Sequence, residues 1–150
     1  MKVEGLIGCY EKTGGLFYFP RMCSKIRLHA EGQLPADYHE LLGGGFDGRT
    51  CRYLSVSYDD VKAQVLAGRS DDEVLAWCFA HGRSLNAEQI LFFNSFMSKR
   101  GWRDDETAEF IPNLIKQYNL PDDGSIQTDF DVIEFDEGRW HPDLWREGWK

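Results

Sequence analysis

The sequence predicts a mainly α-helical protein, a compact bundle of six or seven short helices in a single globular domain spanning residues 1–150. Three observations support this prediction. Apolar residues repeat at helical spacing along the chain, helix-capping motifs recur in its middle, and the segment 90–97 is apolar on more than half of a helical circumference. A helix of that kind is typical of the middle of a bundle, so we expect it to be the central apolar helix.

The composition limits the class of protein. A chain of 150 residues with 42% hydrophobic residues is long and apolar enough to bury a core, which excludes a disordered protein. No apolar run approaches the roughly 18–20 residues that cross a membrane, so no membrane partner is expected. The N-terminal residues lack the apolar core of a signal peptide, which predicts a cytoplasmic location.

The net charge of −8 is unevenly distributed. Residues 1–100 contain 12 acidic and 12 basic residues, whereas residues 101–150 contain 13 acidic and 5 basic ones. The whole excess charge therefore lies in the last third of the chain. Nucleic-acid binding needs a basic surface, so this distribution argues against a nucleic-acid partner.

The first helix is expected between Pro20 and Gly32, after an irregular, glycine-rich segment at residues 1–18. Proline suits the first turn of a helix, and glycine suits the left-handed residue that ends one. A second short helix is expected within residues 33–42, beginning at Pro35. The glycine triplet 43–45 then ends that helix, and Asp47 is expected to cap a further turn.

Capping motifs mark three helices in the middle of the chain, because each pairs an acceptor side chain with an acid or amide three residues later. Each predicted helix stops at a glycine. The three begin at Ser57, Ser70 and Asn86 and end at Gly68, Gly82 and Gly101.

The last third of the chain is less regular. Residues 102–105 lead into a helix that is predicted through Phe110, Leu114, Ile115 and Tyr118, and Pro112 should kink or split it. Residues 128–135 fit a helix begun by Thr128 or, alternatively, a strand; the capping pattern favours the helix. The tail, residues 139–150, is expected to be a docked arm carrying three tryptophans, Trp140, Trp145 and Trp149.

Two motifs resemble a known bacterial family. The first is Phe19-Pro20-Arg21-Met22 with Lys25 and Arg27, and the second is Ser70-Asp71-Asp72-Glu73-Val74-Leu75 with Trp77. Together with Lys99-Arg100-Gly101-Trp102-Arg103-Asp104, they resemble the uncharacterised family catalogued as domain of unknown function 5069. The resemblance implies a cytosolic bacterial domain, but no activity, cofactor or catalytic residue. Ser24 stands where the family pattern has an acid, so no role resting on a carboxylate there is transferred.

A basic stripe on the first predicted helix is the chemically suggestive feature of the chain. Arg21, Lys25 and His29 recur every four residues, so their side chains lie above one another on one helix face. Guanidinium, ammonium and imidazole groups together suit a phosphate or carboxylate. Backbone N–H groups of the glycine-rich loop could complete the site. The predicted anion-binding residues are Arg21, Lys25, Arg27, His29, Gly44, Gly45 and Arg49.

An alternative explains the same residues without a ligand. The acids of the C-terminal third could pair with the stripe inside the protein, forming a structural seam of ion pairs. A solvated surface is a further alternative. The acids available for such a seam are Asp129, Asp131, Glu134, Asp136 and Glu137.

Metal and catalytic sites are poorly supported. The four histidines show no metal-binding spacing, and the cysteines show no C-x-x-C pair, so we expect no cofactor and no metal. A zinc site assembled from distant cysteines stays open. Cys23 lies beside Arg21 and Lys25, where a thiol could be reactive, but its apolar neighbours favour a buried, inert thiol. The four cysteines are Cys9, Cys23, Cys51 and Cys78.

These features lead to two hypotheses from different classes. The first is a small cytosolic binding domain that accepts an anionic small molecule or an acidic peptide on the basic helix face. The second is a protein–protein or self-association module, such as a homodimer, that uses the acidic, tryptophan-containing C-terminal segment. An enzyme of unrecognised chemistry is less well supported, because no catalytic motif stands out.

Overall fold

The computed structural model describes residues 1–150 and contains eight α-helices, one 3-10 helix and a single two-stranded sheet. The prediction of a mainly α-helical protein is confirmed. None of its helices is long and apolar enough to cross a membrane. The elements are β1 (Lys12–Thr13), β2 (Leu16–Phe17), α1 (Phe19–Ala30), η1 (Ala36–Leu41), α2 (Gly45–Tyr53), α3 (Tyr58–Leu66), α4 (Asp71–His81), α5 (Ala87–Lys99), α6 (Ile111–Gln117), α7 (Asp129–Asp136) and α8 (Leu144–Gly148).

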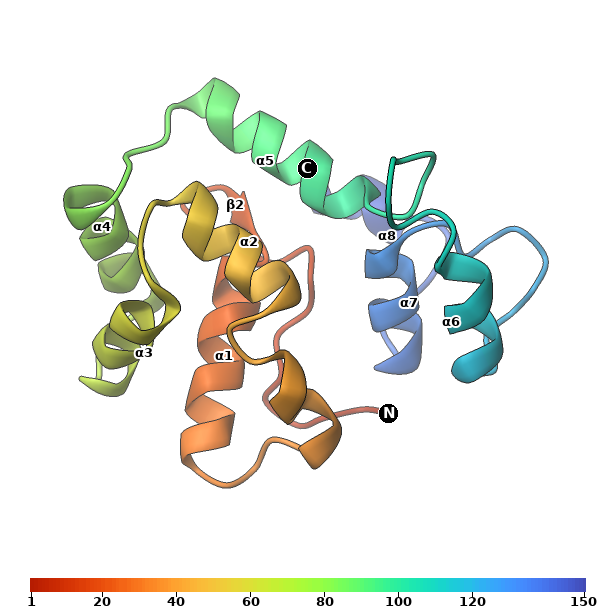
Figure 1. The fold of residues 1–150 in the computed structure, drawn as a ribbon, viewed down its shortest axis with the longest axis horizontal. Helices are drawn as coiled ribbons and strands as arrows, with labels where there is room; N and C mark the ends of the chain where they lie inside the picture. Colours follow the sequence, from red (N-terminus) through yellow and green to blue (C-terminus); the bar gives the residue numbers. More distant parts are fainter.

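The helices form two groups joined by α5. In Figure 1, α1 to α4 gather on one side, α6 and α7 lie on the other, and α5 runs along the upper edge between them. The main core contains 20 buried residues, drawn chiefly from the β-hairpin and α1 to α5. Phe130 of α7 belongs to the same core, where it packs edge-on against Tyr10 and Phe46. The acidic third of the chain is therefore anchored in the main core through α7.

α1 is the helix at the centre of the fold. Nine of its twelve residues are buried, including the charged residues Arg21 and Lys25. Tyr18 stands at its N-cap with a left-handed φ of 74°, a conformation that residues with a side chain rarely adopt. This backbone turn allows the chain to leave the β-hairpin and enter α1 directly.

α5 lies at the edge of the molecule, so the prediction that it is the central helix is wrong. Phe93 and Met97 face the core, whereas Leu91, Phe92 and Phe96 are 50%, 59% and 42% exposed. A helix that is apolar on most of its circumference needs cover on all sides, but here no element packs over the outer side. The local pattern does not say which apolar face finds a neighbour.

Helix starts agree well with the capping motifs. The side chains of Ser70, Asn86 and Thr128 each accept a hydrogen bond from the backbone N–H of the third residue of the helix. The side chain of that third residue accepts a hydrogen bond from the backbone N–H of the capping residue. Ser57 caps α3 through the backbone N–H of Asp60. The helical interpretation of residues 128–135 is therefore confirmed, because both bonds of the capping box form and α7 follows.

Two local predictions are wrong. Pro112 does not kink a long helix; it lies in the first turn of α6, where its missing N–H has no partner to lose. Asp47 does not cap α2, because Gly44 takes the N-cap position and Asp47 lies buried within the first turn. The Asp47 carboxylate instead accepts a hydrogen bond from the N–H of Gly43.

The C-terminal arm packs on the beginning of the chain. Trp149 meets Phe17 edge-on, with 5.0 Å between the ring centres. Gly148 lies against Tyr10 so closely that a Cβ there would come within 2.5 Å of the ring. Glycine is therefore required at this contact, which holds α8 against the N-terminal segment.

Candidate functional site

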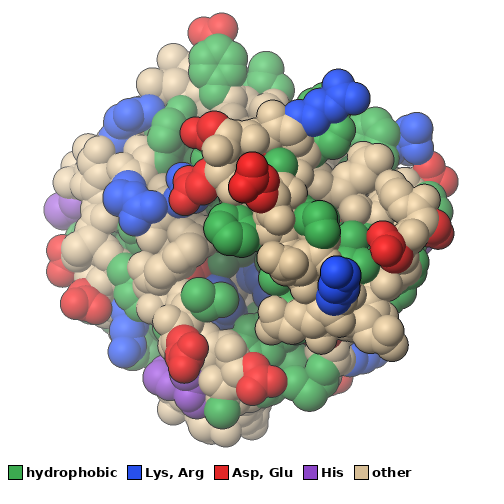
Figure 2. Space-filling model, turned by 45° about the vertical axis from the view of Figure 1, so that its right-hand side comes forward, with side chains coloured by type: hydrophobic (Ala, Val, Ile, Leu, Met, Phe, Trp, Pro, Cys, Tyr) green, Lys and Arg blue, Asp and Glu red, His purple; other side chains and the backbone are tan.

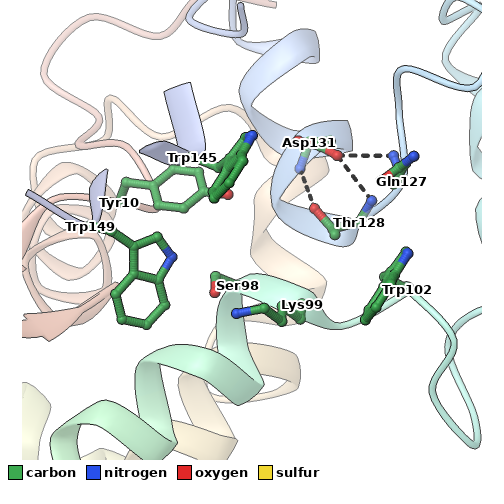
Figure 3. Close-up of a pocket in the computed structure, with 9 residues that line it drawn as sticks. All are labelled: Tyr10, Ser98, Lys99, Trp102, Gln127, Thr128, Asp131, Trp145 and Trp149. Atoms are coloured by element: carbon green, nitrogen blue, oxygen red, sulfur yellow. Dashed lines mark hydrogen bonds between the residues drawn. The ribbon is translucent and has the colours of Figure 1, made fainter. Parts of the chain in front are cut away.

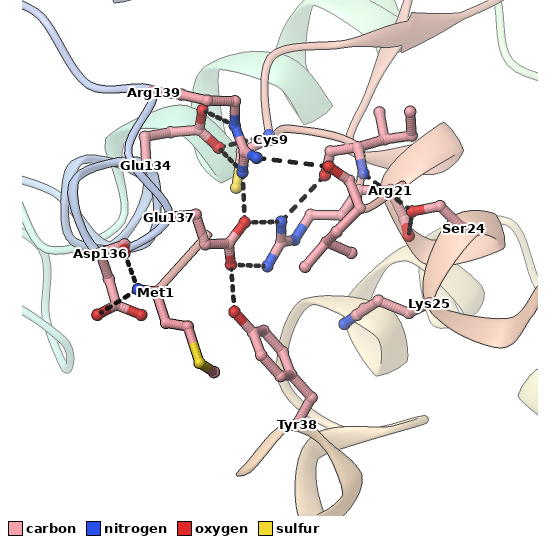
Figure 4. A network of polar contacts seen from close by, with 12 residues as sticks. Met1, Cys9, Arg21, Ser24, Lys25, Tyr38, Glu134, Asp136, Glu137 and Arg139 are labelled. Atoms are coloured by element: carbon pink, nitrogen blue, oxygen red, sulfur yellow. Dashed lines mark hydrogen bonds and ion pairs between the residues drawn. The ribbon is translucent and has the colours of Figure 1, made fainter. Parts of the chain in front are cut away.

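Arg21 is the centre of a buried ion network that joins α1 to the end of α7. Its guanidinium donates two hydrogen bonds of 2.7 Å to the carboxylate of Glu137 and one of 3.0 Å to the backbone oxygen of Ile7. Arg139 bonds both Glu137 and Glu134 (Figure 4). Burial by itself would raise the pKa of Glu137, but its bonds to Arg21 and Arg139 outweigh burial and hold that pKa below its usual value.

The network continues to the N-terminal segment and η1. Glu134 accepts a hydrogen bond of 2.8 Å from the backbone N–H of Cys9, and the hydroxyl of Tyr38 donates one of 3.0 Å to Glu137. The Arg21 Nε is the one nitrogen of this guanidinium without a partner. Four segments that are distant in sequence therefore meet around two carboxylates.

Lys25 lies one turn further along α1 and has a separate partner. Its amine is 2.8 Å from Asp47 and donates to the hydroxyl of Tyr18 at 2.8 Å, while that hydroxyl donates to Asp47 at 2.7 Å. Burial is the largest influence on Lys25 and lowers its pKa, although Asp47 opposes the effect. The two α1 cations are thus satisfied by different elements, α7 and α2.

The other predicted anion-binding residues point elsewhere. Arg27 pairs with Asp71 at 2.7 Å, near the start of α4. His29 is exposed and meets His39 edge-on, and Arg49 lies 3.8 Å from Glu106. In the glycine loop, the N–H of Gly44 donates to the backbone oxygen of Leu41, and Gly45 lies at the start of α2.

The seven predicted residues therefore do not gather on one open surface. The buried cations Arg21 and Lys25, with Arg139, face three carboxylates, so the network has no excess positive charge with which to attract an anion. On the face shown in Figure 2, charges of both signs are interspersed. The Arg21–Glu137 contact is the internal ion-pair seam considered as the alternative.

The four cysteines are buried free thiols, and none forms a disulfide. For Cys23, burial and then the nearby Asp71 carboxylate raise the thiol pKa well above its usual value, which makes the reactive thiolate scarce. The interpretation of Cys23 as a buried thiol is confirmed. No group of three His, Cys, Asp or Glu side chains lies close enough to hold a metal ion.

A cleft lined by aromatic rings lies on another part of the molecule. It has a volume of about 210 Å³ and lies where the end of α5, the start of α7, α8 and the N-terminal segment meet (Figure 3). We call it the tryptophan cleft. Its lining residues are Tyr10, Ser98, Lys99, Trp102, Gln127, Thr128, Asp131, Trp145 and Trp149.

Two charged side chains line the tryptophan cleft, and their situations differ. Asp131 accepts hydrogen bonds from the backbone N–H groups of Gln127 and Thr128 and from the indole of Trp140, so both oxygens of its carboxylate have partners within the chain. Lys99 has no hydrogen bond or ion pair within the chain, and its amine lies 5.1 Å from the centre of the Trp149 ring. Lys99 is therefore the available charge of the cleft.

A second cavity of about 280 Å³ adjoins the tryptophan cleft and shares Gln127, Asp131 and Trp145 with it. Arg146 also lines this cavity, but it is paired with Asp143 at 2.6 Å. Of these two cations, Lys99 in the tryptophan cleft is therefore the one without a carboxylate partner.

Sequence reasoning anticipated the docked tryptophans but missed Lys99. The lysine precedes Arg100 and Trp102 in an ordinary helix end, and its role depends on Trp149, 50 residues later in the chain. A cationic residue followed by an aromatic one near the end of a helix is the only local signal.

The comparison with protein families decides the relationship suggested by the motifs. The model of the family described as "Domain of unknown function (DUF5069)" matches residues 5–139. The chain belongs to the DUF5069 family. A search of curated proteins found no significant match.

The DUF5069 match contains the whole buried network, from Ile7 to Arg139. It also contains Lys99, Trp102 and Asp131 of the tryptophan cleft, whereas Trp145 and Trp149 follow it. The C-terminal arm thus completes a cleft whose other walls belong to the DUF5069 domain.

Proposed function

We propose that this DUF5069 protein is a small binding domain whose ligand is an anionic, planar aromatic small molecule bound in the tryptophan cleft. The observation that carries the proposal is the position of Lys99, an unpaired cation beside aromatic rings. A ligand carboxylate or phosphate would pair with the amine, while its ring would stack on an indole.

The sign of the ligand charge follows from the lining. A cationic ligand would need the electron-rich face of a ring or a carboxylate. The amine of Lys99 already lies over the face of Trp149, and the oxygens of Asp131 already accept three hydrogen bonds. An anion meets neither obstacle and gains the lysine as a partner.

This proposal keeps the ligand class expected from the sequence but moves its site. On α1 the cations have buried carboxylate partners, and a ligand would have to displace them at a large cost. In the tryptophan cleft, the cation is solvated and nothing has to be displaced. We propose the bacterial cytoplasm as the setting, as the family resemblance implies.

Calorimetric titration with 2-naphthoate, a planar aromatic carboxylate, tests the proposal. Binding should weaken as salt is added, because the charge pair is exposed. Lys99→Gln should weaken it about tenfold or more, which corresponds to about 1.4 kcal/mol. The matched control is Lys116→Gln, an exposed lysine of α6 outside the cleft.

The uncharged analogue 2-naphthalenemethanol should bind more weakly than 2-naphthoate. Equal affinity of the wild type and Lys99→Gln for 2-naphthoate would overturn the proposal. Absence of binding at millimolar concentration would do the same.

A second candidate is a protein-binding role for the tryptophan-containing C-terminal segment. The ring of Trp145 favours it, because it is 47% exposed and lies between the two cavities. An interface anchored by this ring should persist at high salt, unlike the binding of 2-naphthoate. Trp145→Ala with pull-down at low and at high salt separates the two roles.

A further inference from the structure

The outer face of α5 is an exposed apolar surface on the side of the helix that points away from the core. Leu91, Phe92 and Phe96 are all at least 42% exposed, and Phe92, at 59%, is the most exposed of them. The two phenylalanines are one helical turn apart, so their rings lie side by side along the helix. Figure 1 shows α5 along the upper edge of the molecule. Contiguous apolar patches of this kind mark interaction surfaces.

Charges of opposite sign stand at the two ends of this face. Glu88 lies one turn before Phe92 and forms no ion pair within the chain. Arg49 of α2 lies over the ring of Phe96, with 5.2 Å from its guanidinium carbon to the ring centre. Its nearest carboxylate, that of the exposed Glu106, is 3.8 Å away. Arg100 also lies over the ring of Phe96, with 4.9 Å from its guanidinium carbon to the ring centre, and contacts the exposed Asp105 and Glu106. Along the outer face itself the order is acid, phenylalanine, phenylalanine, arginine.

We propose that this face binds the same face of a second copy of the chain, with the two α5 helices antiparallel about a two-fold axis at Phe92. Phe92 then meets the partner's Phe92. Glu88, four residues before the axis, comes opposite the partner's Phe96, four residues after it. The partner's Arg49 lies over that ring and receives the carboxylate of Glu88, and the same pair forms again on the other side of the axis.

A second copy is the occupant that the charge pattern fits. A two-fold interface places the same patch on both sides, so it must be complementary to itself. An acid at one end and an arginine at the other satisfy this condition when the helices run antiparallel. A parallel pairing would bring Glu88 against the partner's Glu88, and a purely acidic partner would be repelled by that residue.

The contact is small, so the dimer is expected to be weak. One helix face and one arginine fall short of the roughly 800 Å² per partner that stable interfaces bury. The proposed dimer contact is separate from the proposed ligand site, because Lys99 lies outside residues 88–96. Dimerisation and ligand binding can therefore be tested separately.

Sedimentation velocity of the full chain, from about 5 to about 500 μM, measures the association. The wild type should shift from monomer toward dimer over this range. Phe92→Asp should stay monomeric, and its circular dichroism should show that it is folded. The matched control is Leu66→Asp, which changes an exposed leucine of α3 and should dimerise like the wild type.

Charge exchange tests the antiparallel arrangement. Glu88→Arg and Arg49→Glu should each weaken the dimer about tenfold or more, and the double variant should recover most of the loss. Under mild oxidation, Phe92→Cys should form a disulfide-linked dimer, while Leu66→Cys should not. A wild type that is monomeric at the highest concentration would overturn the proposal, as would a Phe92→Asp variant that still dimerises. Failure of the double variant to recover would overturn the antiparallel register.

Discussion

Arg21 and Glu137 are 116 residues apart in the sequence, yet they share two hydrogen bonds of 2.7 Å, and each side chain is only 3% exposed. This pair joins the central helix α1 to the acidic end of α7. Both charges are buried and have lost their hydration, so the ion pair compensates part of the desolvation cost of each.

Replacing Arg21 by methionine should therefore deprive a buried carboxylate of its bidentate partner and leave Glu137 only its bonds to Arg139 and Tyr38. We expect a loss of about 3–5 kcal/mol in the free energy of unfolding, measured by urea denaturation. The control is Arg27→Met, which removes a partly exposed pair with Asp71 and should cost about 0–1 kcal/mol.

The double variant Arg21→Met with Glu137→Leu should be more stable than Arg21→Met alone, because no charge is left unpaired. Thermal melts with about 10 mM phosphate provide a second check, since a bound anion raises the melting temperature. A rise that is present in the wild type and lost in Arg21→Met would instead favour an anion site on α1.

Acid should destabilise the protein through Glu137. Its pKa in the folded protein lies below the ordinary value of 4.5, so the unfolded chain takes up this proton more readily. The contribution to stability is complete above about pH 4.5 and is lost as the pH falls through the folded pKa.

In Glu137→Gln, stability at neutral pH should be lower, but its decline below pH 4.5 should be shallower than in the wild type. Chemical denaturation at several pH values between neutral and acid measures both slopes. Equal slopes would show that other carboxylates dominate the acid transition.

Gly148→Ala should displace the C-terminal arm. The added Cβ would lie 2.5 Å from the Tyr10 ring, and such overpacking costs about 1–3 kcal/mol. Tryptophan fluorescence should change, and 2-naphthoate binding should weaken because Trp145 and Trp149 move. Gly44→Ala is the control: its Cβ would meet nothing closer than 3.7 Å, so fluorescence and binding should stay as in the wild type.

Phe93 and its neighbour Phe92 should differ sharply in their effect on stability. Phe93→Ala removes a ring that is 5% exposed and should cost about 3–5 kcal/mol. Phe92→Ala removes a ring that is 59% exposed and should change stability by about 0.5 kcal/mol or less, measured at low concentration. Similar losses for both would show that α5 is covered on both sides.

The helix starts could be predicted because their cause is local. Ser70 with Glu73 and Thr128 with Asp131 satisfy backbone groups within one turn, so neighbouring residues suffice to predict the cap. Pro112 shows that even local signals can be ambiguous. A proline restricts the backbone in the same way at a helix start and at a kink, and here it lies in the first turn of α6.

The candidate sites could be predicted only in part. The basic stripe on α1 follows from the helical repeat, and the internal seam of ion pairs was one of its three explanations. The seam holds for Arg21 because Glu137, far along the chain, lies against it in the fold. It holds for Lys25 because Asp47 lies inside the first turn of α2, where its carboxylate pairs with the amine, and does not cap that helix. Lys99 was missed because Trp149 meets it only in the folded chain.

The sequence by itself determined the mainly α-helical class, the family, the capped helix starts and the acidic character of the last third. These depend on composition and on contacts between residues a few positions apart. The tertiary structure alone decided that α1 and not α5 is central, that the α1 cations are buried with carboxylates, and that Lys99 stays unpaired. Burial and pairing are properties of elements brought together from distant parts of the chain, and a helical repeat carries no record of which face another element will cover.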